Sequence, residues 1–458
     1  MRSPLTALHV VQPGDGGVAR VVTDVIAAQL DLGMRVAVAC PPGTPLALAA
    51  GARGAEVHPW RAGREPGPRL VAESRRVAAL VDLVRPDLVH AHSAKAGLAA
   101  RIAVRGRIPT VYQPHAWSFE AVDGVTGALA RRWERWAARW TDRVICVSEA
   151  ERRRGEHAGV RAPWSVIHNG VDARRFTAGP GRAAARAALG LPPTAPLVVC
   201  VGRLCRQKGQ DVLLDAWPAV LARVPDARLV LVGDGPEAEA LRTAAAGLCV
   251  PAAGFAPAAG FAPAAGFAPA AGFAPDTGPG PRAAAGPRTD TGPGPRPGPR
   301  TAAAAGTATA SRTAAAPCGA ADRTVTFAGA VTDTAPWYRA ADLVVQPSRW
   351  EGMALAPLEA MAGGRPVLLT DVDGARESLP PGQEAHCLVR PDDPAALADA
   401  LTALLRRPVL REALGRRAQQ HVLRRFDVRR ANAALADVYR EVTAAPRHRH
   451  ELGEPISQ

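Results

Sequence analysis

The sequence predicts an α/β protein with two doubly wound domains that face each other across a cleft. Three observations lead to this prediction. Short β-branched runs alternate with helical patterns almost from end to end of the 458 residues. These runs are apolar throughout, which is typical of parallel strands covered by helices on both faces. They also form two series, with a Pro-, Gly- and Ala-rich stretch at 170–195 between them.

The first series opens with a strand at 8–12 and an amphipathic helix, in which Val18, Val22 and Ile26 recur at helical spacing. Gly33 can end that helix. The other strands expected in this series are 35–40, 87–92, 110–115, 143–148 and 165–169. The second series is expected to contain strands at 196–203, 228–235, 323–330, 343–348, 365–371 and 386–390.

A low-complexity segment interrupts the second series. The sequence PAAGFA occurs four times between 251 and 274, DTGPGPR occurs at 276–282 and again at 290–296, and Ala/Thr-rich sequence follows. So much Pro and Gly prevents regular helix or strand, and the period is too short for a solenoid. We therefore expect 251–320 to be a disordered insertion in a surface loop.

These patterns divide the chain into five parts. We expect an N-terminal acceptor-side domain at 1–175, a linker at 176–195, a donor domain at 196–405, helices at 406–445 that cross back to the first domain, and a disordered tail at 446–458.

The composition limits the classes of partner. The net charge is +14 and the pI is near 10.6, which permits nucleic acid or an anionic membrane surface. No zinc finger, aromatic-rich sheet motif or lysine-rich tail supports nucleic acid, and a general arginine bias explains the charge equally well. The seven cysteines form no C-x-x-C pair, which favours reduced thiols. Without a signal-peptide pattern or a long apolar run, we expect a cytoplasmic protein.

The residues that follow the strands of the second series suggest the chemistry, because ligands of open parallel sheets bind at the carboxyl ends of strands. Arg203 and Lys208 follow the strand at 196–203, and Lys208 is one of only two lysines in the chain. Glu351 lies in a later loop, and Glu359 lies eight residues further on, inside a helix expected to start near 353–355. Two cations, a helix N-terminus and two carboxylates suit a diphosphate joined to hydroxyl-rich groups, as in a sugar nucleotide.

Eight motifs resemble those of one known family and occur in its order. GRLCRQKGQD, LVLVGDGPE, VTFAGAV and PSRWEGMALAPLEAMAGGRPV look like the donor domain of the retaining GT-B glycosyltransferases of family 4. PDLVHAHSAKAG, YQPHAWSF with DRVICVSEAE, and VIHNGVDARRF resemble the acceptor domain of the same enzymes, particularly bacterial ones that build surface polysaccharides and glycolipids. The resemblance covers nearly the whole chain apart from 251–320 and the tail, and it implies two Rossmann-like domains.

The resemblance also implies roles for the donor-side residues. Arg203 and Lys208 would hold the donor diphosphate and stabilise the charge of the leaving nucleotide. Glu359 would bind the ribose, and Glu351 the hydroxyls of the transferred sugar. The backbone amides that would contact the sugar or the β-phosphate are those of Met353, Ala354 and Leu355, and the turn at Gly233 would lie near the base.

In the first domain, Gly16 and Gly17 follow the first strand and would let the backbone approach the donor phosphate or the acceptor. A dinucleotide-binding domain would use such glycines too, but it expects a carboxylate at the end of the second strand, where this sequence reads AVACPPG. His115 matches the position where family members place a histidine near the transferred sugar. We expect it and Glu351 to be the catalytic pair.

Three other features leave alternatives open. The H-x-H at His90 and His92 could suggest a metal, but no partner cluster is evident and the family needs none, so no metal or other cofactor is expected. Lys95 either reaches an anionic acceptor or simply opens a helix. The stretch 129–140 places Leu129, Trp133, Trp136 and Trp140 on one helical face among arginines; this face either docks on an anionic membrane or, as the pattern favours, packs on the sheet.

The sequence therefore predicts a metal-independent, retaining transfer of a hexosyl group from a UDP-, GDP- or ADP-sugar to a sugar, polyol or lipid-linked hydroxyl. Two rivals remain. A GT-B-fold enzyme of another reaction, such as an epimerase, would form product without an acceptor. A non-catalytic basic binding protein would show salt-dependent binding and no affinity for nucleotides.

Overall fold

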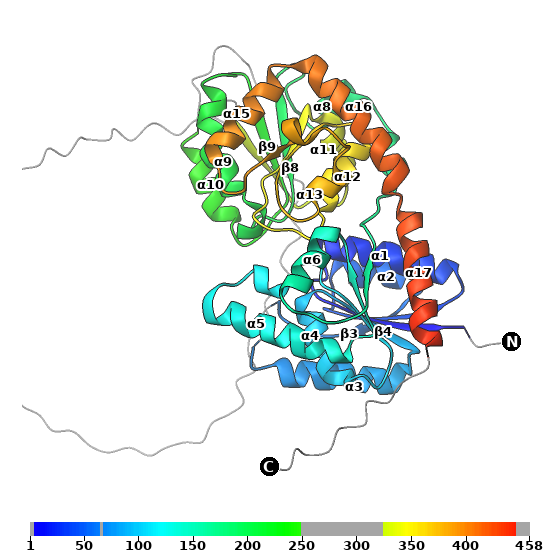
Figure 1. The fold of residues 1–458 in the computed structure, drawn as a ribbon. Helices are drawn as coiled ribbons and strands as arrows, with labels where there is room; N and C mark the ends of the chain where they lie inside the picture. Colours follow the sequence, from blue (N-terminus) through cyan, green and yellow to red (C-terminus); the bar gives the residue numbers. More distant parts are fainter. Residues whose placement is uncertain (1–3, 65–66, 249–323, 446–458) are drawn as a thin grey trace, which may run out of the picture.

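The computed structural model of the chain describes residues 4–64, 67–248 and 324–445, and it contains two parallel sheets with helices on their faces (Figure 1). The expected insertion at 251–320 and the tail at 446–458 lie outside the described residues. The strand orders are β3-β2-β1-β4-β5-β6-β7 in the first sheet and β10-β9-β8-β11-β12-β13 in the second. Every pairing between neighbouring strands is parallel, as the apolar runs predicted.

The first sheet consists of β1 (Thr6–Val11), β2 (Arg35–Cys40), β3 (Glu56–Pro59), β4 (Leu88–His92), β5 (Thr110–Gln113), β6 (Arg143–Cys146) and β7 (Trp164–Val166). Its helices are α1 (Gly16–Asp31), α2 (Pro45–Ala52), α3 (Leu70–Val84), α4 (Ala94–Val104), α5 (Gly124–Ala137) and α6 (Glu149–His157), with 3-10 turns η1 (Ser118–Glu120) and η2 (Ala138–Trp140). The sequence analysis missed β3, which is four residues long and only half apolar.

The second sheet consists of β8 (Leu197–Val201), β9 (Arg228–Val232), β10 (Val325–Gly329), β11 (Leu343–Gln346), β12 (Val367–Thr370) and β13 (Leu388–Val389). The helices on it are α8 (Arg182–Ala188), α9 (Gln210–Leu221), α10 (Ala238–Ala246), α11 (Ala335–Ala340), α12 (Leu355–Ala362), α13 (Ala375–Ser378), α14 (Glu384–Cys387), α15 (Pro394–Leu405) and α16 (Pro408–Arg425), with the 3-10 turn η3 (Arg206–Lys208). Helix α7 (Ala173–Thr177) follows the first sheet and packs on α11 and α12, and α17 (Val428–Ala444) ends the described chain.

The apolar side chains bury on both faces of each sheet. In the first domain, α1 and α17 share a core with β1, β4, β5 and β6 on one face, whereas α3 and α4 pack on the other. The second domain has one continuous core around β8, β9, β11 and β12. Of the two long helices at 406–445, α16 packs against α12 of the second domain, and α17 alone lies on the first sheet (Figure 1).

The chain crosses between the domains twice, and the two crossings lie against each other. After β7, Val171 donates its backbone N–H to the Phe426 carbonyl at 2.8 Å, and Val428 donates to the Val171 carbonyl at 3.3 Å. Gly170 permits this approach, because a Cβ there would lie 2.5 Å from the Val428 Cα. The domains are therefore joined along one hydrogen-bonded seam.

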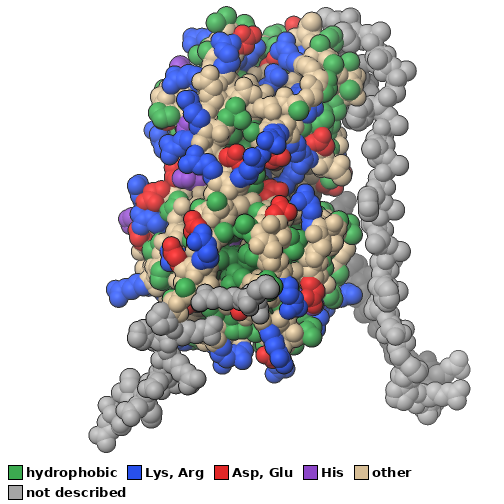
Figure 2. All heavy atoms as spheres, turned by 90° about the vertical axis from the view of Figure 1, so that its right-hand side faces the viewer, with side chains coloured by type: hydrophobic (Ala, Val, Ile, Leu, Met, Phe, Trp, Pro, Cys, Tyr) green, Lys and Arg blue, Asp and Glu red, His purple; other side chains and the backbone are tan. Residues whose placement is uncertain are grey.

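The surface charge is spread rather than gathered on the face that carries α16 and α17. Lys and Arg side chains cover much of this face with Asp and Glu interspersed among them (Figure 2). On this face, the distribution favours a general arginine bias over a dedicated nucleic-acid surface as the source of the positive charge.

Candidate active site

The donor side of the cleft is built at the carboxyl ends of β8 and β11. Lys208 ends η3, and its ammonium forms an ion pair with the carboxylate of Glu351, which lies in the loop after β11. The Ser348 hydroxyl donates to the same carboxylate at 2.7 Å. The two residues that the sequence predicted to share a site are therefore in direct contact.

Arg203 supplies the second predicted cation. It follows β8, and its backbone carbonyl accepts a hydrogen bond from the Gln210 side chain at 3.0 Å, which fixes the loop. Within the described residues its guanidinium forms no ion pair, although the chain is rich in such pairs. A cation that is held by its backbone and lacks a carboxylate partner is suited to binding an anionic ligand.

The N-terminus of α12 lies beside these cations. Its N-cap residue is Ala354, which has no side-chain acceptor, so the amides of the first turn lack a capping side chain. Asn169 of the first domain donates its side-chain amide to the Met353 carbonyl at 2.8 Å and so orients the segment that leads into Leu355. The helix starts where the sequence predicted and offers its positive end to an anion.

Glu359 lies one turn inside α12 and is buried. Its carboxylate accepts hydrogen bonds from the Tyr338 hydroxyl at 2.9 Å and the Thr334 hydroxyl at 3.3 Å, and Arg20 of α1 lies 3.7 Å away. The sequence analysis identified Glu359 but none of these partners. Arg20 is the informative one, because it reaches Glu359 from the other domain and so places this carboxylate at the cleft.

Of the predicted glycines Gly16, Gly17 and Gly233, only Gly233 lies where another backbone segment approaches closely. Gly16 begins α1 with a φ of 70°, and a Cβ on Gly17 would lie 3.9 Å from the Leu355 side chain. The N-termini of α1 and α12 therefore lie next to each other where the two domains meet. Gly233 has a φ of 140°, and a Cβ there would lie 2.0 Å from the Gly202 carbonyl, so only glycine fits at this turn.

His115 lies in a strained turn that contacts the Glu351 loop. His115 has a φ of 56° and Ala116 a φ of 113°, and the Ala116 N–H donates to the buried Glu151 carboxylate at 2.6 Å. A Cβ on Gly352 would lie 3.1 Å from the Ala116 nitrogen. The structure thus brings the loops of the two predicted catalytic residues, one from each domain, into contact.

One carboxyl group of this region was missed from the sequence. Glu120 accepts the Trp117 N–H at 3.0 Å and pairs with Arg154 at 2.8 Å, and Arg154 also pairs with Asp373 of the second domain at 2.6 Å. Burial, and then the nearby Asp373 charge, raise the pKa of Glu120 to about 7. A lone Glu in the sequence SFE carries no pattern that would have revealed this environment.

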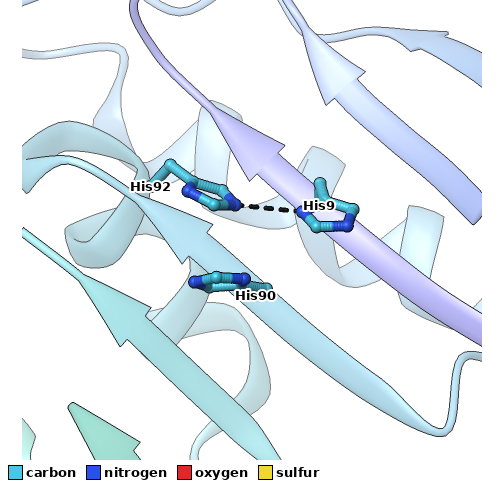
Figure 3. A group of neighbouring side chains, drawn as sticks. All are labelled: His9, His90 and His92. Atoms are coloured by element: carbon cyan, nitrogen blue, oxygen red, sulfur yellow. Dashed lines mark hydrogen bonds between the residues drawn. The ribbon is translucent and has the colours of Figure 1, made fainter. Parts of the chain in front are cut away.

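The structure decides between the two alternatives for Lys95, contact with an anionic acceptor or a place at the start of a helix. This side chain is 3% exposed and pairs with Glu73 of α3 at 2.7 Å, so it stabilises the packing of α4 on α3 and does not reach an acceptor. His90 and His92 are also buried, and His9 of β1 joins them, with three ring nitrogens within 4.8 Å of one another (Figure 3). The sequence analysis did not include His9 in this group.

The expected packing of the tryptophan face of α5 is wrong in part. The residues of α5 that are buried are Gly127, Glu134 and Ala137. Leu129 is 61% exposed and Trp136 is 44% exposed, although Trp133 and Trp140 are partly covered and contact Trp136. Across the described residues, no helix combines the length and apolar character needed to cross a membrane.

Comparison with known proteins agrees with this architecture. The Glycosyltransferase Family 4 model matches residues 15–175, and the Glycosyl transferases group 1 model matches 195–264 and 298–407. A lipopolysaccharide core biosynthesis mannosyltransferase of Rhizobium meliloti is 26% identical over 92% of this chain and 93% of its own length. A D-inositol 3-phosphate glycosyltransferase of Streptomyces bingchenggensis is 29% identical over 78% of this chain and 66% of its own length.

Solved structures share the fold. Anabaena HepE superposes with a TM-score of 0.70 at 21% identity, over 95% of this chain and all of its own. Sucrose-phosphate synthase of Thermosynechococcus elongatus gives a TM-score of 0.69 at 21% identity, over 96% of this chain and all of its own. With a Glycosyltransferase Family 4 domain followed by a group 1 domain in the two-domain GT-B fold, the chain belongs to the glycosyltransferases.

Proposed function

We propose that this glycosyltransferase is a retaining, metal-independent hexosyltransferase that uses a nucleotide-diphosphate sugar. The observation that carries the proposal is the contact of Lys208 with Glu351, in the loop that leads to the uncapped N-terminus of α12 and so to the N-terminus of α1, with Arg203 following the same strand as Lys208. Positive groups from both walls suit a diphosphate, and buried Glu351 and Glu359 suit vicinal hydroxyls on either side of it.

The relatives support the same class of reaction and its setting. HepE has been solved with UDP and glucose and with UDP-glucose, and the R. meliloti relative is named as a lipopolysaccharide core mannosyltransferase. A donor of the UDP-, GDP- or ADP-sugar type and a role in surface polysaccharide or glycolipid synthesis follow for this chain as part of the proposal.

In the proposed reaction, the bond between the anomeric carbon and the phosphate oxygen breaks, and the acceptor oxygen attacks from the same face. The acceptor proton passes to the leaving phosphate oxygen, so no enzyme nucleophile is needed. Arg203, Lys208 and the α12 amides stabilise the charge that develops on the leaving diphosphate. Glu359 binds the ribose, Glu351 the sugar hydroxyls, and His115 a hydroxyl at the reacting end.

The first test is nucleotide release and sugar transfer across a panel of UDP-, GDP- and ADP-sugars. We expect one nucleotide to be released selectively, and both Lys208→Ala and Glu359→Ala to lower kcat/KM by about 10²-fold or more. Lys208→Arg tests whether the compact ammonium is needed, and the exposed Arg206→Ala, two residues away, is the matched control. The proposal fails if folded protein neither binds nor turns over any of these donors, or if product forms without an acceptor.

We also propose that α5 contacts an anionic membrane, as an enzyme with a lipid-linked acceptor would require. Val125, Leu129 and Trp136 are 78%, 61% and 44% exposed, and they recur at helical spacing with arginines around them. Such a face is suited to the headgroup layer of a bilayer.

Co-sedimentation with vesicles tests this contact. We expect binding to phosphatidylglycerol vesicles, weaker binding to phosphatidylcholine vesicles, and loss of binding in Leu129→Gln/Trp136→Gln. A matched pair of exposed apolar residues outside α5, Leu48→Gln/Val409→Gln, should bind as the wild type does. Equal binding by all three proteins would exclude α5 as the contact.

A further inference from the structure

A line of hydrogen-bonded nitrogen atoms runs from His115 into the core of the first domain. His115 Nε2 lies 3.3 Å from His92 Nδ1, and His92 Nε2 lies 3.0 Å from His9 Nδ1. His9 Nε2 lies 2.8 Å from the side-chain oxygen of Gln29 on α1. Figure 3 shows the inner part of this line, with the His9 and His92 rings reaching toward each other from neighbouring strands.

The inner end of the line determines where each proton lies. The Gln29 oxygen can only accept, so His9 Nε2 must donate and carry the proton. In a neutral ring the other nitrogen then accepts, so His9 Nδ1 accepts from His92 Nε2–H. The same step applied to His92 makes its Nδ1 the acceptor and His115 Nε2 the donor.

This reasoning requires neutral rings, and burial supplies that condition. His9 and His92 are fully buried, and the pKa of His9 falls to about 4 while that of His92 falls well below its usual 6.5. Burial also lowers the pKa of His115 to about 3. All three rings therefore carry one proton each at neutral pH, and the protons all point inward.

The outer end of the line is left with an acceptor at the cleft. His115 Nδ1 has no hydrogen-bond partner among the described residues, and the turn that carries it is held from behind by Glu151 and touches the Gly352 loop. The ring of His115 is thus held by His92, and the turn that carries it is held by Glu151, both of the first domain.

We propose that Gln29, His9 and His92 are positioning residues that hold His115 in the tautomer protonated on Nε2, so that its Nδ1 lone pair accepts a hydrogen bond from a substrate hydroxyl. This inference rests on the proposed function and adds the direction of the contact: His115 accepts a hydrogen bond from the substrate and does not donate one. Because an amide oxygen does not take up a proton, the line orients His115 and does not conduct protons away.

A metal ion held by His9, His90 and His92 would require the opposite arrangement. Their ring nitrogens lie within 4.8 Å of one another, but a metal would need lone pairs from both His9 Nδ1 and His92 Nε2. His92 would then be protonated on Nδ1 and would turn the His115 contact around. The protonation of the His115 ring therefore distinguishes the two arrangements.

The test is a long-range ¹H–¹⁵N correlation spectrum of the full chain labelled with ¹⁵N-histidine at neutral pH, without substrate. We expect the His115 Nδ1 resonance in the unprotonated region and Nε2 in the protonated region. Gln29→Leu removes the final acceptor and should move both resonances toward a mixture of tautomers. The exposed Gln420→Leu should change nothing.

Three results would overturn the inference. They are a His115 ring protonated on Nδ1 in the wild type, His115 resonances that do not change in Gln29→Leu, and a shift of the His9, His90 and His92 resonances when Zn²⁺ is added. Once a donor is known, Gln29→Leu should lower kcat by about 10²-fold with little change in the donor KM. Since the spectrum needs no substrate, it remains readable even if the panel of sugar nucleotides gives no turnover.

Discussion

The two lysines of this arginine-rich chain have different environments. Lys95 is buried against Glu73 and stabilises the packing of two helices, whereas Lys208 reaches the cleft and contacts Glu351. The sequence predicted that Lys208 and Glu351 share a site, because each follows a strand of the second series; the role of Lys208 toward the donor stays a prediction. The sequence left Lys95 open, because its partner lies 22 positions away on another helix, where no local pattern links the two.

His9 shows what a sequence pattern could have revealed about the core. Counting alternate positions along β1 and β4 places His9 on the same face as His90 and His92, and the register pairs His9 with His90. The signal was present once the two strands were assumed to be neighbours. The contacts of Gln29 could not be foreseen in this way, because they depend on how α1 lies across the sheet.

The buried histidines predict a loss of stability in mild acid. The pKa of His9 falls to about 4 on folding, chiefly because of burial, which the Gln29 hydrogen bond partly offsets. Below pH 6.5 the unfolded chain binds a proton that the folded chain does not, so the free energy of unfolding decreases as the pH falls from 6.5 toward 4. For His9 the decrease is about 1.4 kcal/mol per pH unit; above pH 6.5 this contribution is absent.

Thermal unfolding between pH 7.5 and 4.5 measures this effect. His9→Gln should start less stable but lose stability less steeply with acid than the wild type. The exposed His157→Gln should follow the wild-type slope. Parallel slopes for all three proteins would show that His9 is not the titrating group.

At the scale of elements, the sequence predicted where the strands lie better than it predicted what the helices pack against. It located the start of α12 and every strand of the two sheets except β3. Apolar runs and a helix N-terminus are local signals, so a short stretch of sequence is enough to show them. It assigned both C-terminal helices to the crossing, although α16 packs on α12. It also favoured burial of the α5 tryptophans. Apolar residues at helical spacing give the same sequence pattern whether that face of the helix packs on a sheet or contacts a membrane.

The loop before α12 is one of the places where the two domains approach closely. A Cβ on Gly352 would lie 2.8 Å from the Val147 side chain and 3.0 Å from the Glu151 carboxylate. Gly352→Ala should therefore displace the Glu351 loop from the His115 turn. Since a shift of about 1 Å in a reacting group can cost about 10²-fold in rate, we expect kcat to fall by that order while the donor still binds.

Steady-state kinetics with donor binding measured in parallel test this prediction. Gly63→Ala is the matched control, since a Cβ there meets no atom within 4 Å. An unchanged kcat for Gly352→Ala would mean that the loop does not need its present contact for transfer.

At the scale of the whole molecule, charged contacts hold the cleft in its present geometry. Glu377 of α13 accepts the backbone N–H groups of Glu149 and Ala150 at 2.8 Å each, and so caps α6 of the opposite domain. His168 contacts the same carboxylate at 2.9 Å. No local sequence pattern indicates these contacts, because each joins residues that are more than 200 positions apart.

Removing this cap should favour a more open arrangement of the domains. We expect Glu377→Ala to increase the radius of gyration measured by small-angle scattering and to raise the donor KM several-fold, since closure becomes less favourable. The exposed Glu412→Ala on α16 removes the same charge without touching the cleft and should match the wild type. A scattering profile unchanged by Glu377→Ala would show that other contacts suffice to hold the domains together.

The seam at Val171 and Phe426–Val428 limits how the two halves can move. Because the two crossings lie side by side and are hydrogen-bonded to each other, the two domains can rotate about this seam as about a hinge. Sliding or twisting of one domain against the other would break the hydrogen bonds of the seam. The same arrangement makes the join redundant. A protease that cuts one crossing leaves the two domains connected by the other. A molecule cut once should therefore keep its two domains together in their present arrangement.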